Sequence, residues 1–436
     1  MTGAPGRPAR AAAAALCCGA LLVPAAPAWA APRPAATSAP TPAATSGTAA
    51  TSGAADPAAL PVIGQNRGAG RPDGCVKPSD KGTDRTPWAQ TYLRPEAAWQ
   101  LSRGAGVTVA VVGSGVDPAS GVLEGRLTPG PREYGPGDST RDCVGHGTFL
   151  AGLIAARRQD GIGFAGLAPE ARILGVAVTD DVGNTTPALL AKGIRDAADG
   201  GARIIAVGLA LSTGEAELGD AVRYAGGKGA LVIAPAAPDG GGGSQSSPNS
   251  PPVAAFPAAL PGVLAVSDLA PNGAPPSGAA DAVRVDLVAP GDAVLSVGPG
   301  GKGYFTAAGP SFATALAAGT AALALAYRPD LTPARLADRL RATAYHPGTA
   351  LPDPHLGYGT VDPLAALSAP LQDGPPATPG PALAVSLVQS PPPDPAARQA
   401  TLIAGGIIAG VTLVVGTAVV CATGRRRAWR PGRWSV

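Results

Sequence analysis

The chain has few of the residues that metal and nucleotide sites need. It holds only 3 histidines among 436 residues, and no two of them have the spacing of metal ligands. It has no Walker-type phosphate loop. The glycine run at 240–243 lacks the preceding strand and following helix of such a loop, so it is better explained as a surface loop. We therefore expect neither a metal nor a cofactor.

Basic residues are scarce in the middle of the chain. The net charge is +3, but seven of the 33 lysines and arginines lie near the two ends: Arg7, Arg10, Arg425, Arg426, Arg427, Arg430 and Arg433. The remaining 26 basic residues face 30 acidic ones. Such a balance offers no electrostatic footprint for nucleic acid. Aromatic residues make up only 4%, beside 61 Gly and 49 Pro, and we attribute this skew to compositional bias.

Both ends of the chain read as targeting segments. Residues 1–30 combine arginines, an apolar stretch and the small-x-small site Ala28-Trp29-Ala30, which is typical of a secretory signal. Residues 401–423 are uncharged, mostly apolar and long enough to span a bilayer as a helix. The arginines that follow favour a cytoplasmic C-terminus. We expect a cell-membrane protein with a single span and its bulk outside.

The cysteines fit this topology. Cys17 and Cys18 leave with the signal, and Cys421 lies near the membrane edge. Cys75 and Cys143 remain as an even pair in an oxidising compartment, which predicts a disulfide. Two free thiols are the alternative. The bond would hold the N-terminal extension beside the histidine at 146.

Composition and pattern divide the chain into segments. Residues 31–61, rich in Ala, Pro and Thr, cannot bury a core and are predicted to be disordered. The full series is a signal peptide (1–30), this disordered segment (31–61), an N-terminal extension (62–106), a folded domain (107–370), a Pro-rich linker (371–400), a transmembrane helix (401–423) and a basic tail (424–436).

The folded domain alternates apolar strands with amphipathic helices. Strands are predicted at 107–112, 171–178, 202–210, 230–237 and 262–269, with helical stretches between them. Continuously apolar strands indicate a mainly parallel sheet covered by helices on both faces, a three-layer α/β fold. Functional groups in such folds gather at the carboxyl ends of the strands.

Two motifs carry the chemistry of a serine nucleophile. His146 stands in a Gly-His-Gly-Thr frame, and Ser311 opens a helix of small residues far downstream. A histidine can take the proton of a serine if a carboxylate holds its tautomer. In the chain order Asp, His, Ser the acid should follow the strand at 107–112. That position holds Gly113.

Together these residues resemble the subtilases, and within them the mycosins, membrane-anchored proteases associated with type VII secretion. The resemblance rests on "PWAQTYLRPEAAWQLSRGAGVTVAVV", "DCVGHGTFLAGLIAA", "FPAALPGVLAVS", "DLVAPGDAVLS", "AAGPSFATALAAG" and "GYGTVDPLAAL". It implies a subtilisin-like fold and serine endopeptidase chemistry at Ser311 and His146. A cysteine before the catalytic histidine, paired to the N-terminal extension, is also similar to mycosins.

The departures from this pattern concern proton transfer and oxyanion binding. Gly113 replaces the acid, and Asp239 stands where the family has the asparagine that binds the oxyanion. Asp117 is four residues on, where no ordinary turn would return its carboxylate, and Ser114 could hydrogen-bond the imidazole, although a neutral hydroxyl cannot offset an imidazolium charge. Compensation by Asp117 or Ser114 is an alternative that the sequence leaves open. We therefore expect a catalytically impaired pseudoprotease that binds secretion-complex membrane proteins or an extended peptide.

Two alternatives remain open. The protein could be an active serine endopeptidase of low or narrow activity that uses Ser311 and His146. It could also be a membrane-tethered binding domain unrelated to secretion, although nothing but the anchor favours that interpretation.

Overall fold

The computed structural model describes residues 60–64, 74–240, 251–371 and 395–426. The predicted signal peptide and nearly all of the predicted disordered segment lie outside the described residues. So do the glycine run beyond Gly240, most of the linker and the end of the basic tail. The chain divides into a unit at 1–59, of which nothing is described, and a unit at 60–436.

A seven-stranded sheet forms the centre of the second unit. Its strands lie in the order β3-β4-β2-β5-β6-β7-β8, and every neighbouring pair is parallel. Their bounds are β2 Thr108–Gly113, β3 Leu127–Arg132, β4 Arg172–Ala177, β5 Ile204–Val207, β6 Leu231–Pro235, β7 Val263–Leu269 and β8 Leu287–Pro290. The five predicted strands are all present, and the predicted α/β fold is confirmed.

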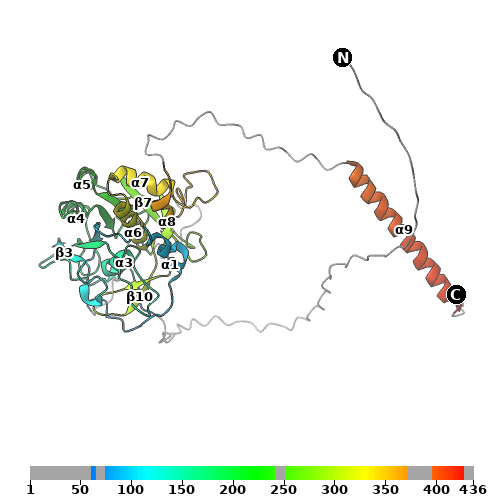
Figure 1. Ribbon diagram of the computed structural model, residues 1–436, viewed down its shortest axis with the longest axis horizontal. Helices are drawn as coiled ribbons and strands as arrows, with labels where there is room; N and C mark the ends of the chain where they lie inside the picture. The colour runs from blue at the N-terminus through cyan, green and yellow to red at the C-terminus, as the bar shows by residue number, and fades with distance from the viewer. Residues whose placement is uncertain (1–59, 65–73, 241–250, 372–394, 427–436) are drawn as a thin grey trace, which may run out of the picture. The chain divides into compact units, whose positions relative to one another are not determined.

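Helices cover both faces of this sheet (Figure 1). Strand β2 shows why: Val109 and Val111 belong to the core beneath α3 (His146–Ala155) and α6 (Pro310–Tyr327). Ala110 and Val112 belong to the opposite core, beneath α4 (Pro187–Asp199) and α5 (Ala216–Gly227). Because successive side chains of a strand point to opposite faces, an unbroken apolar strand needs cover on both sides.

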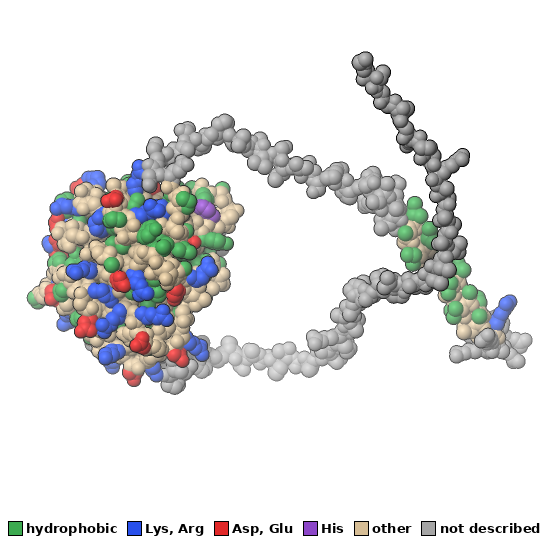
Figure 2. Space-filling model, viewed as in Figure 1, with side chains coloured by type: hydrophobic (Ala, Val, Ile, Leu, Met, Phe, Trp, Pro, Cys, Tyr) green, Lys and Arg blue, Asp and Glu red, His purple; other side chains and the backbone are tan. Residues whose placement is uncertain are grey.

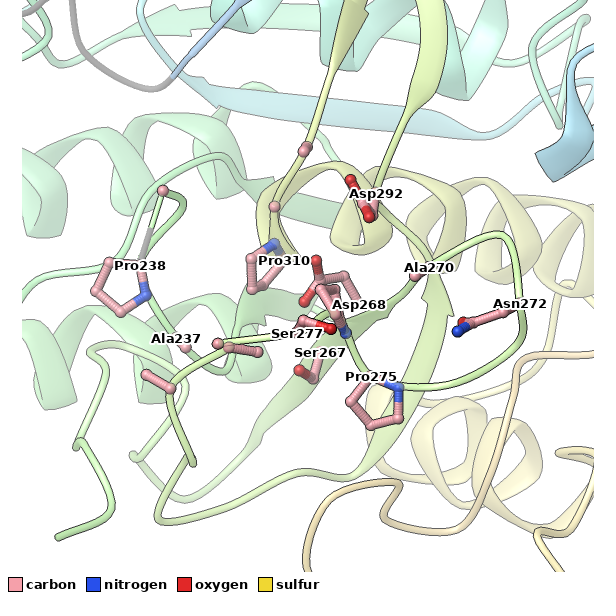
Figure 3. Close-up of a pocket in the computed structure, with 17 residues that line it drawn as sticks. Ala237, Pro238, Ser267, Asp268, Ala270, Asn272, Pro275, Ser277, Asp292 and Pro310 are labelled. Carbon is pink, nitrogen blue, oxygen red and sulfur yellow. The ribbon is translucent and has the colours of Figure 1, made fainter. Parts of the chain in front are cut away.

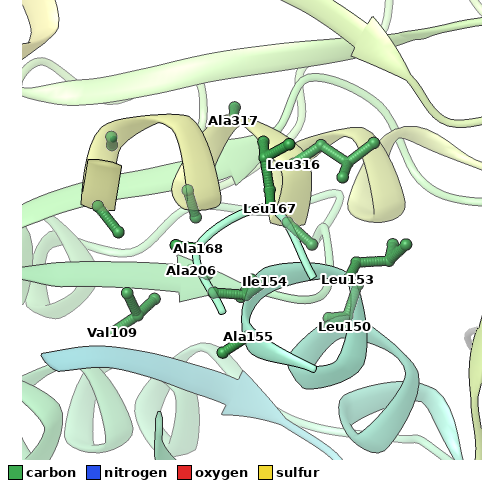
Figure 4. Packing of buried hydrophobic residues seen from close by; sticks show 14 of the residues in the cluster. Val109, Leu150, Leu153, Ile154, Ala155, Leu167, Ala168, Ala206, Leu316 and Ala317 are labelled. Carbon is green, nitrogen blue, oxygen red and sulfur yellow. The ribbon is translucent and has the colours of Figure 1, made fainter. Parts of the chain in front are cut away.

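The helices that deliver the site residues are buried all round. Figure 4 shows Leu150, Leu153 and Ile154 of α3 packing near Leu316 and Ala317 of α6. Alanine and glycine on α6 let it pass close to its neighbours, and a Cβ at Gly319 would lie 2.8 Å from the Cβ of Leu167. A buried helix of this kind needs small residues rather than a polar face.

Several elements were absent from the sequence prediction. A small sheet holds β1 (Val62–Ile63), β10 (Tyr304–Ala307) and β9 (Val294–Val297). Edge strand β3 contains two prolines, which a central strand could not accept. Strand β8 has only 4 residues, too few for a clear pattern. The other elements of the described residues are helical, and the sequence pattern does predict a helix near Trp88 and another from Pro333: α1 Trp88–Leu93, α2 Pro95–Ala98, the 3-10 turn Pro118–Ser120, α7 Pro333–Ala342 and α8 Pro363–Ser368.

The segment 62–106 joins the same core. Leu93, Ala98 and Trp99 pack into the cluster beneath α3 and α6. The structure bonds Cys75 to Cys143, and the N–H of Val76 donates to the carbonyl of Cys143 (2.8 Å). The extension is therefore attached three residues before His146.

Helix α9 (Pro395–Arg426) contains the candidate membrane span. Within its 23-residue candidate span Ile403–Arg425, the most apolar 18-residue stretch has a mean hydropathy of 2.3, and none of that stretch is buried. Helix α6 is also long and apolar enough, but 89% of it is buried, so it is a core helix. The predicted span at 401–423 agrees with the candidate span Ile403–Arg425 to within two residues at each end.

Candidate active site

The fold brings His146 and Ser311 into hydrogen-bond contact across 165 positions of sequence. His146 is the first residue of α3 and Ser311 the second of α6, so both helices present their N-termini to the site. The distance from Nε2 of His146 to Oγ of Ser311 is 2.8 Å, and the two residues are 2% and 0% exposed. This is the contact that a serine nucleophile and its base require.

Asp239 hydrogen-bonds both of these residues. Its Oδ1 accepts a hydrogen bond from the backbone N–H of Ser311 (2.9 Å). Its Oδ2 lies 3.0 Å from Nε2 of His146 and accepts from the hydroxyl of Ser311. The side chains of both His146 and Asp239 are only 3% exposed. The carboxylate therefore occupies the space in which a substrate carbonyl would meet the nucleophile.

The chemistry of these contacts opposes acyl transfer. A carboxylate only accepts hydrogen bonds, so Asp239 bonds Nε2 when that nitrogen carries a proton. An imidazole with its proton on Nε2 cannot take the proton of Ser311. The carboxylate also holds the N–H of Ser311, and it places negative charge where an oxyanion would develop.

The other ring nitrogen of His146 has no carboxylate beside it. Among the described residues none hydrogen-bonds Nδ1. Gly208 lies next to Nδ1, because a Cβ added to Gly208 would be 3.4 Å from that nitrogen. The N–H of Gly208 donates to the carbonyl of Val112 (2.9 Å). Gly113 follows Val112 at the end of β2, and a Cβ added to it would meet nothing within 4 Å. The backbone leaves room for an acid that the sequence does not supply.

The two nearby candidates for compensation are engaged elsewhere. Asp117 accepts hydrogen bonds from the N–H groups of Ala119 (2.7 Å) and Gly300 (3.0 Å). The hydroxyl oxygen of Ser114 accepts from the N–H of Gly147 (2.9 Å), and Ser114 also hydrogen-bonds Asp142. Neither side chain hydrogen-bonds the imidazole of His146.

Sequence reasoning missed Asp142, which holds the start of α3. Its carboxylate accepts from the N–H groups of Gly145 (2.7 Å) and Thr148 (2.8 Å) and from the hydroxyl of Thr148 (2.6 Å). Burial raises the pKa of Asp142, while the hydrogen bonds from Thr148, Ser114 and Gly145 act in the opposite direction. An acid just before a helix start is the signal that could have revealed it.

Asp268 was also missed, because it is a single charged residue within the mainly apolar strand β7. It is 4% exposed. Burial and the negative charges of Asp239 and Asp292 raise the pKa of Asp268 to about 7. Its carboxylate lines a cavity of about 370 Å³ beside Ser311, to which Pro238, Gly309 and Pro310 also contribute (Figure 3).

Residues 104–359 match the family model described as the subtilase family. Mycosin-1 of Mycolicibacterium smegmatis is 34% identical over 387 residues, covering 77% of this chain and 84% of the relative. Mycosin-1 of Mycobacterium tuberculosis is 32% identical over 421 residues, covering 83% and 91%. Thermitase of Thermoactinomyces vulgaris is 34% identical over 247 residues, covering 56% and 84%.

Solved structures of mycosins are also similar to this chain. The crystal structure of MycP1 with its N-terminal propeptide removed aligns with a TM-score of 0.59 at 34% identity, covering 67% of this chain and 99% of that one. A chain of an intact ESX-5 inner membrane complex aligns with a TM-score of 0.63 at 28% identity, covering 84% and 97%. With the shared fold and the paired His146 and Ser311, these matches show that the chain belongs to the subtilase family and, within it, to the mycosins.

Proposed function

We propose that this protein is a catalytically impaired mycosin, a membrane-anchored component of a type VII secretion system that binds partners or extended peptide. Structures similar to it include MycP1 from the ESX-1 type VII secretion system and an assembly from the ESX-5 inner membrane complex. These similarities support a place beside secretion-complex membrane proteins.

One observation carries the impairment: the carboxylate of Asp239 bonds the N–H and hydroxyl of Ser311 and Nε2 of His146. In subtilisin, loss of the triad acid lowers turnover about 10⁴-fold, and loss of the oxyanion asparagine lowers it about 10²–10³-fold. This chain departs at both positions. A carboxylate in the oxyanion site is more unfavourable than an absent donor, because it repels the charge that the transition state develops.

The alternative function is a slow or narrow serine endopeptidase. The 2.8 Å contact between His146 and Ser311 favours it, since nucleophile and base keep the arrangement of a working pair. For that function the carboxylate of Asp239 has to leave the site or be neutralised when substrate binds.

Membrane attachment through α9 completes the proposal. The apolar span Ile403–Arg425 anchors the chain, and the arginines at 425–427 favour a cytoplasmic tail with the folded domain outside. On the face of the folded domain in Figure 2, basic and acidic side chains are interspersed. Such a surface suits protein partners better than nucleic acid.

A fluorophosphonate probe tests the impairment directly. The full chain is purified in detergent and compared with Ser311→Ala, and a mycosin with the unaltered family residues is labelled in parallel. We expect labelling no higher than that of Ser311→Ala, and no turnover of a peptide library. Ser311-dependent labelling together with turnover would establish the endopeptidase instead.

Complementation tests the role in secretion. In the native host, deletion of the gene should abolish type VII secretion, and either the intact chain or Ser311→Ala should restore it equally. A chain truncated before α9 should fail to restore it. Normal secretion in the deletion strain would refute the secretion role, whereas restoration by the intact chain alone would refute the non-catalytic role.

A further inference from the structure

The cavity beside Ser311 is formed by segments that meet only in the folded chain. It is lined by residues 237–240 after β6, by the end of β7 with the loop that follows, by Asp292 after β8, and by residues 308–310 at the start of α6. Its volume of about 370 Å³ is at the small end for ligand pockets. It can therefore take one long side chain but not an extended ligand.

Asp268 is the buried polar group of this cavity. Figure 3 shows its carboxylate within the ring of lining residues, with Pro310 and Pro275 nearby. No other residue in the described part of the chain donates a hydrogen bond to it, and its own backbone N–H is the only donor. A buried carboxylate without partners is unfavourable by several kcal/mol unless a cation or donor compensates it.

The negative charge around Asp268 is uncompensated. Asp292 is half buried and lines the same cavity, and Asp239 is close enough to raise the pKa of Asp268. The lining contains no lysine, arginine or histidine. Among the described residues, neither Asp268 nor Asp292 forms an ion pair. The cavity thus presents concentrated negative potential beside the nucleophile.

We propose that this cavity, with Asp268 at its base and Asp292 at its side, is a binding pocket for the lysine or arginine side chain of a peptide lying across Ser311. Alanines and prolines of the lining would contact the methylene stem, and the two carboxylates would receive the cationic head. The pocket shares Gly309 and Pro310 with the start of the Ser311 helix, so the two subsites are contiguous.

A metal ion fits this cavity less well than an organic cation. Calcium takes six to eight oxygen ligands, whereas the pocket offers two carboxylates among mainly small apolar residues. No group of three or more possible metal ligands occurs in the part of the chain that the structure covers. An ammonium or guanidinium group needs only one or two carboxylates and an apolar channel.

Peptide binding to the full chain in detergent tests the proposal. The probes are acetylated, amidated alanine hexapeptides with a single lysine at each position in turn, each matched to norleucine at the same position. By calorimetry, we expect lysine to bind about tenfold or more tightly than norleucine in at least one register. Asp268→Asn should remove that preference and Asp292→Asn should reduce it, while the exposed Asp160→Asn should leave it unchanged.

Three outcomes would overturn the pocket: equal binding of lysine and norleucine in every register, a lysine preference that persists in Asp268→Asn, or Asp268-dependent binding of calcium without peptide selectivity. Asparagine has nearly the volume of aspartate, so Asp268→Asn should fold. Asp292→Asn tests the same pocket independently through its second carboxylate. The pocket rests on the proposed peptide-binding role, but the experiments distinguish failure of the pocket from failure of the proposed function. Lysine selectivity without a secretion phenotype refutes the secretion role alone, and normal complementation without selectivity refutes the pocket alone.

Discussion

An aspartate accepts hydrogen bonds at the N-terminus of each of the two helices of the site, and the two aspartates have opposite consequences. Asp142 holds the N-terminus of α3 through the N–H groups of Gly145 and Thr148. Asp239 holds the N-terminus of α6 through Ser311 itself. Both satisfy helix N–H groups with a carboxylate. The first holds the start of the helix that carries His146, whereas the second contacts the backbone N–H and hydroxyl of Ser311, where we propose that a substrate would react.

The comparison shows that the same carboxylate contact that stabilises a helix N-terminus can be unfavourable for activity. A carboxylate is a good partner for helix N–H groups wherever it stands. At α6 the same N–H would be needed for the developing oxyanion. Asp239 thus stabilises the folded state by accepting a hydrogen bond from the Ser311 N–H, the group that we propose an oxyanion would need.

The largest expected effect, on the rate of peptide hydrolysis, comes from replacing the Asp239 carboxylate by an amide while restoring an acid at position 113. In Gly113→Asp with Asp239→Asn, an acid returns beside Nδ1 and an amide donor replaces the carboxylate. We expect peptide hydrolysis to rise at least 10³-fold over the unaltered chain, measured with a fluorogenic peptide pool. Each single variant should gain far less because the other defect remains. Addition of Ser311→Ala should remove the gain, and no gain in the double variant would contradict the assigned positions.

Asp268 extends the comparison to a carboxylate that is buried like Asp142 but lacks its donors. Its pKa of about 7 lies above the ordinary value near 4. The native state therefore keeps a proton that the unfolded chain releases as the pH rises from about 4 to about 7. Stability should fall across that window by up to about 4 kcal/mol.

Thermal unfolding of the full chain in detergent measures this effect. Asp268→Asn should show a flatter pH profile and be the more stable protein at pH 8, with little difference at pH 4. Asp160→Asn is the matched surface control. Identical profiles for Asp268→Asn and the unaltered chain would show that Asp268 is compensated in solution.

Loss of Asp142 should have a smaller effect of the opposite sign. Asp142→Ala leaves the N–H groups of Gly145 and Thr148 without their buried acceptor. We expect the free energy of unfolding to fall by about 2–3 kcal/mol. Chemical denaturation at pH 7 checks this value, with the exposed Asp338→Ala as control. A loss below 0.5 kcal/mol, on the order of a surface change, would contradict the assigned role.

The smallest effect is expected at Ser114. Ser114→Ala removes the acceptor of the Gly147 N–H and a donor to Asp142. The expected loss of stability is about 1 kcal/mol by the same measurement. If the Ser114 hydroxyl instead hydrogen-bonded the imidazole of His146, adding Ser114→Ala to the Gly113→Asp variant would change the rate at which Ser311 reacts with the fluorophosphonate probe. We expect that reactivity to stay the same after correction for folded fraction.

Much of the fold could be predicted from sequence because its signals are local. Apolar runs such as that of β2 require cover on both faces, and Thr332 with Pro333 marks the start of α7, where the threonine side chain accepts from Arg335 N–H (3.3 Å). The small sheet was missed because β1 pairs with β10 across most of the chain. Strand β3 was missed because its prolines conceal an edge position.

The sequence by itself determined the residue types at the candidate site: His146 and Ser311, together with Gly113 and Asp239, which we propose stand in place of an acid and an amide. Motif frames and chain order suffice for that. Only the tertiary structure decided what these residues do to one another. It directs the carboxylate of Asp239 onto Ser311 and His146, engages Asp117 and Ser114 elsewhere, and gathers Asp268 and Asp292 around one cavity. Contacts between distant segments depend on packing of the whole domain, which no local pattern specifies.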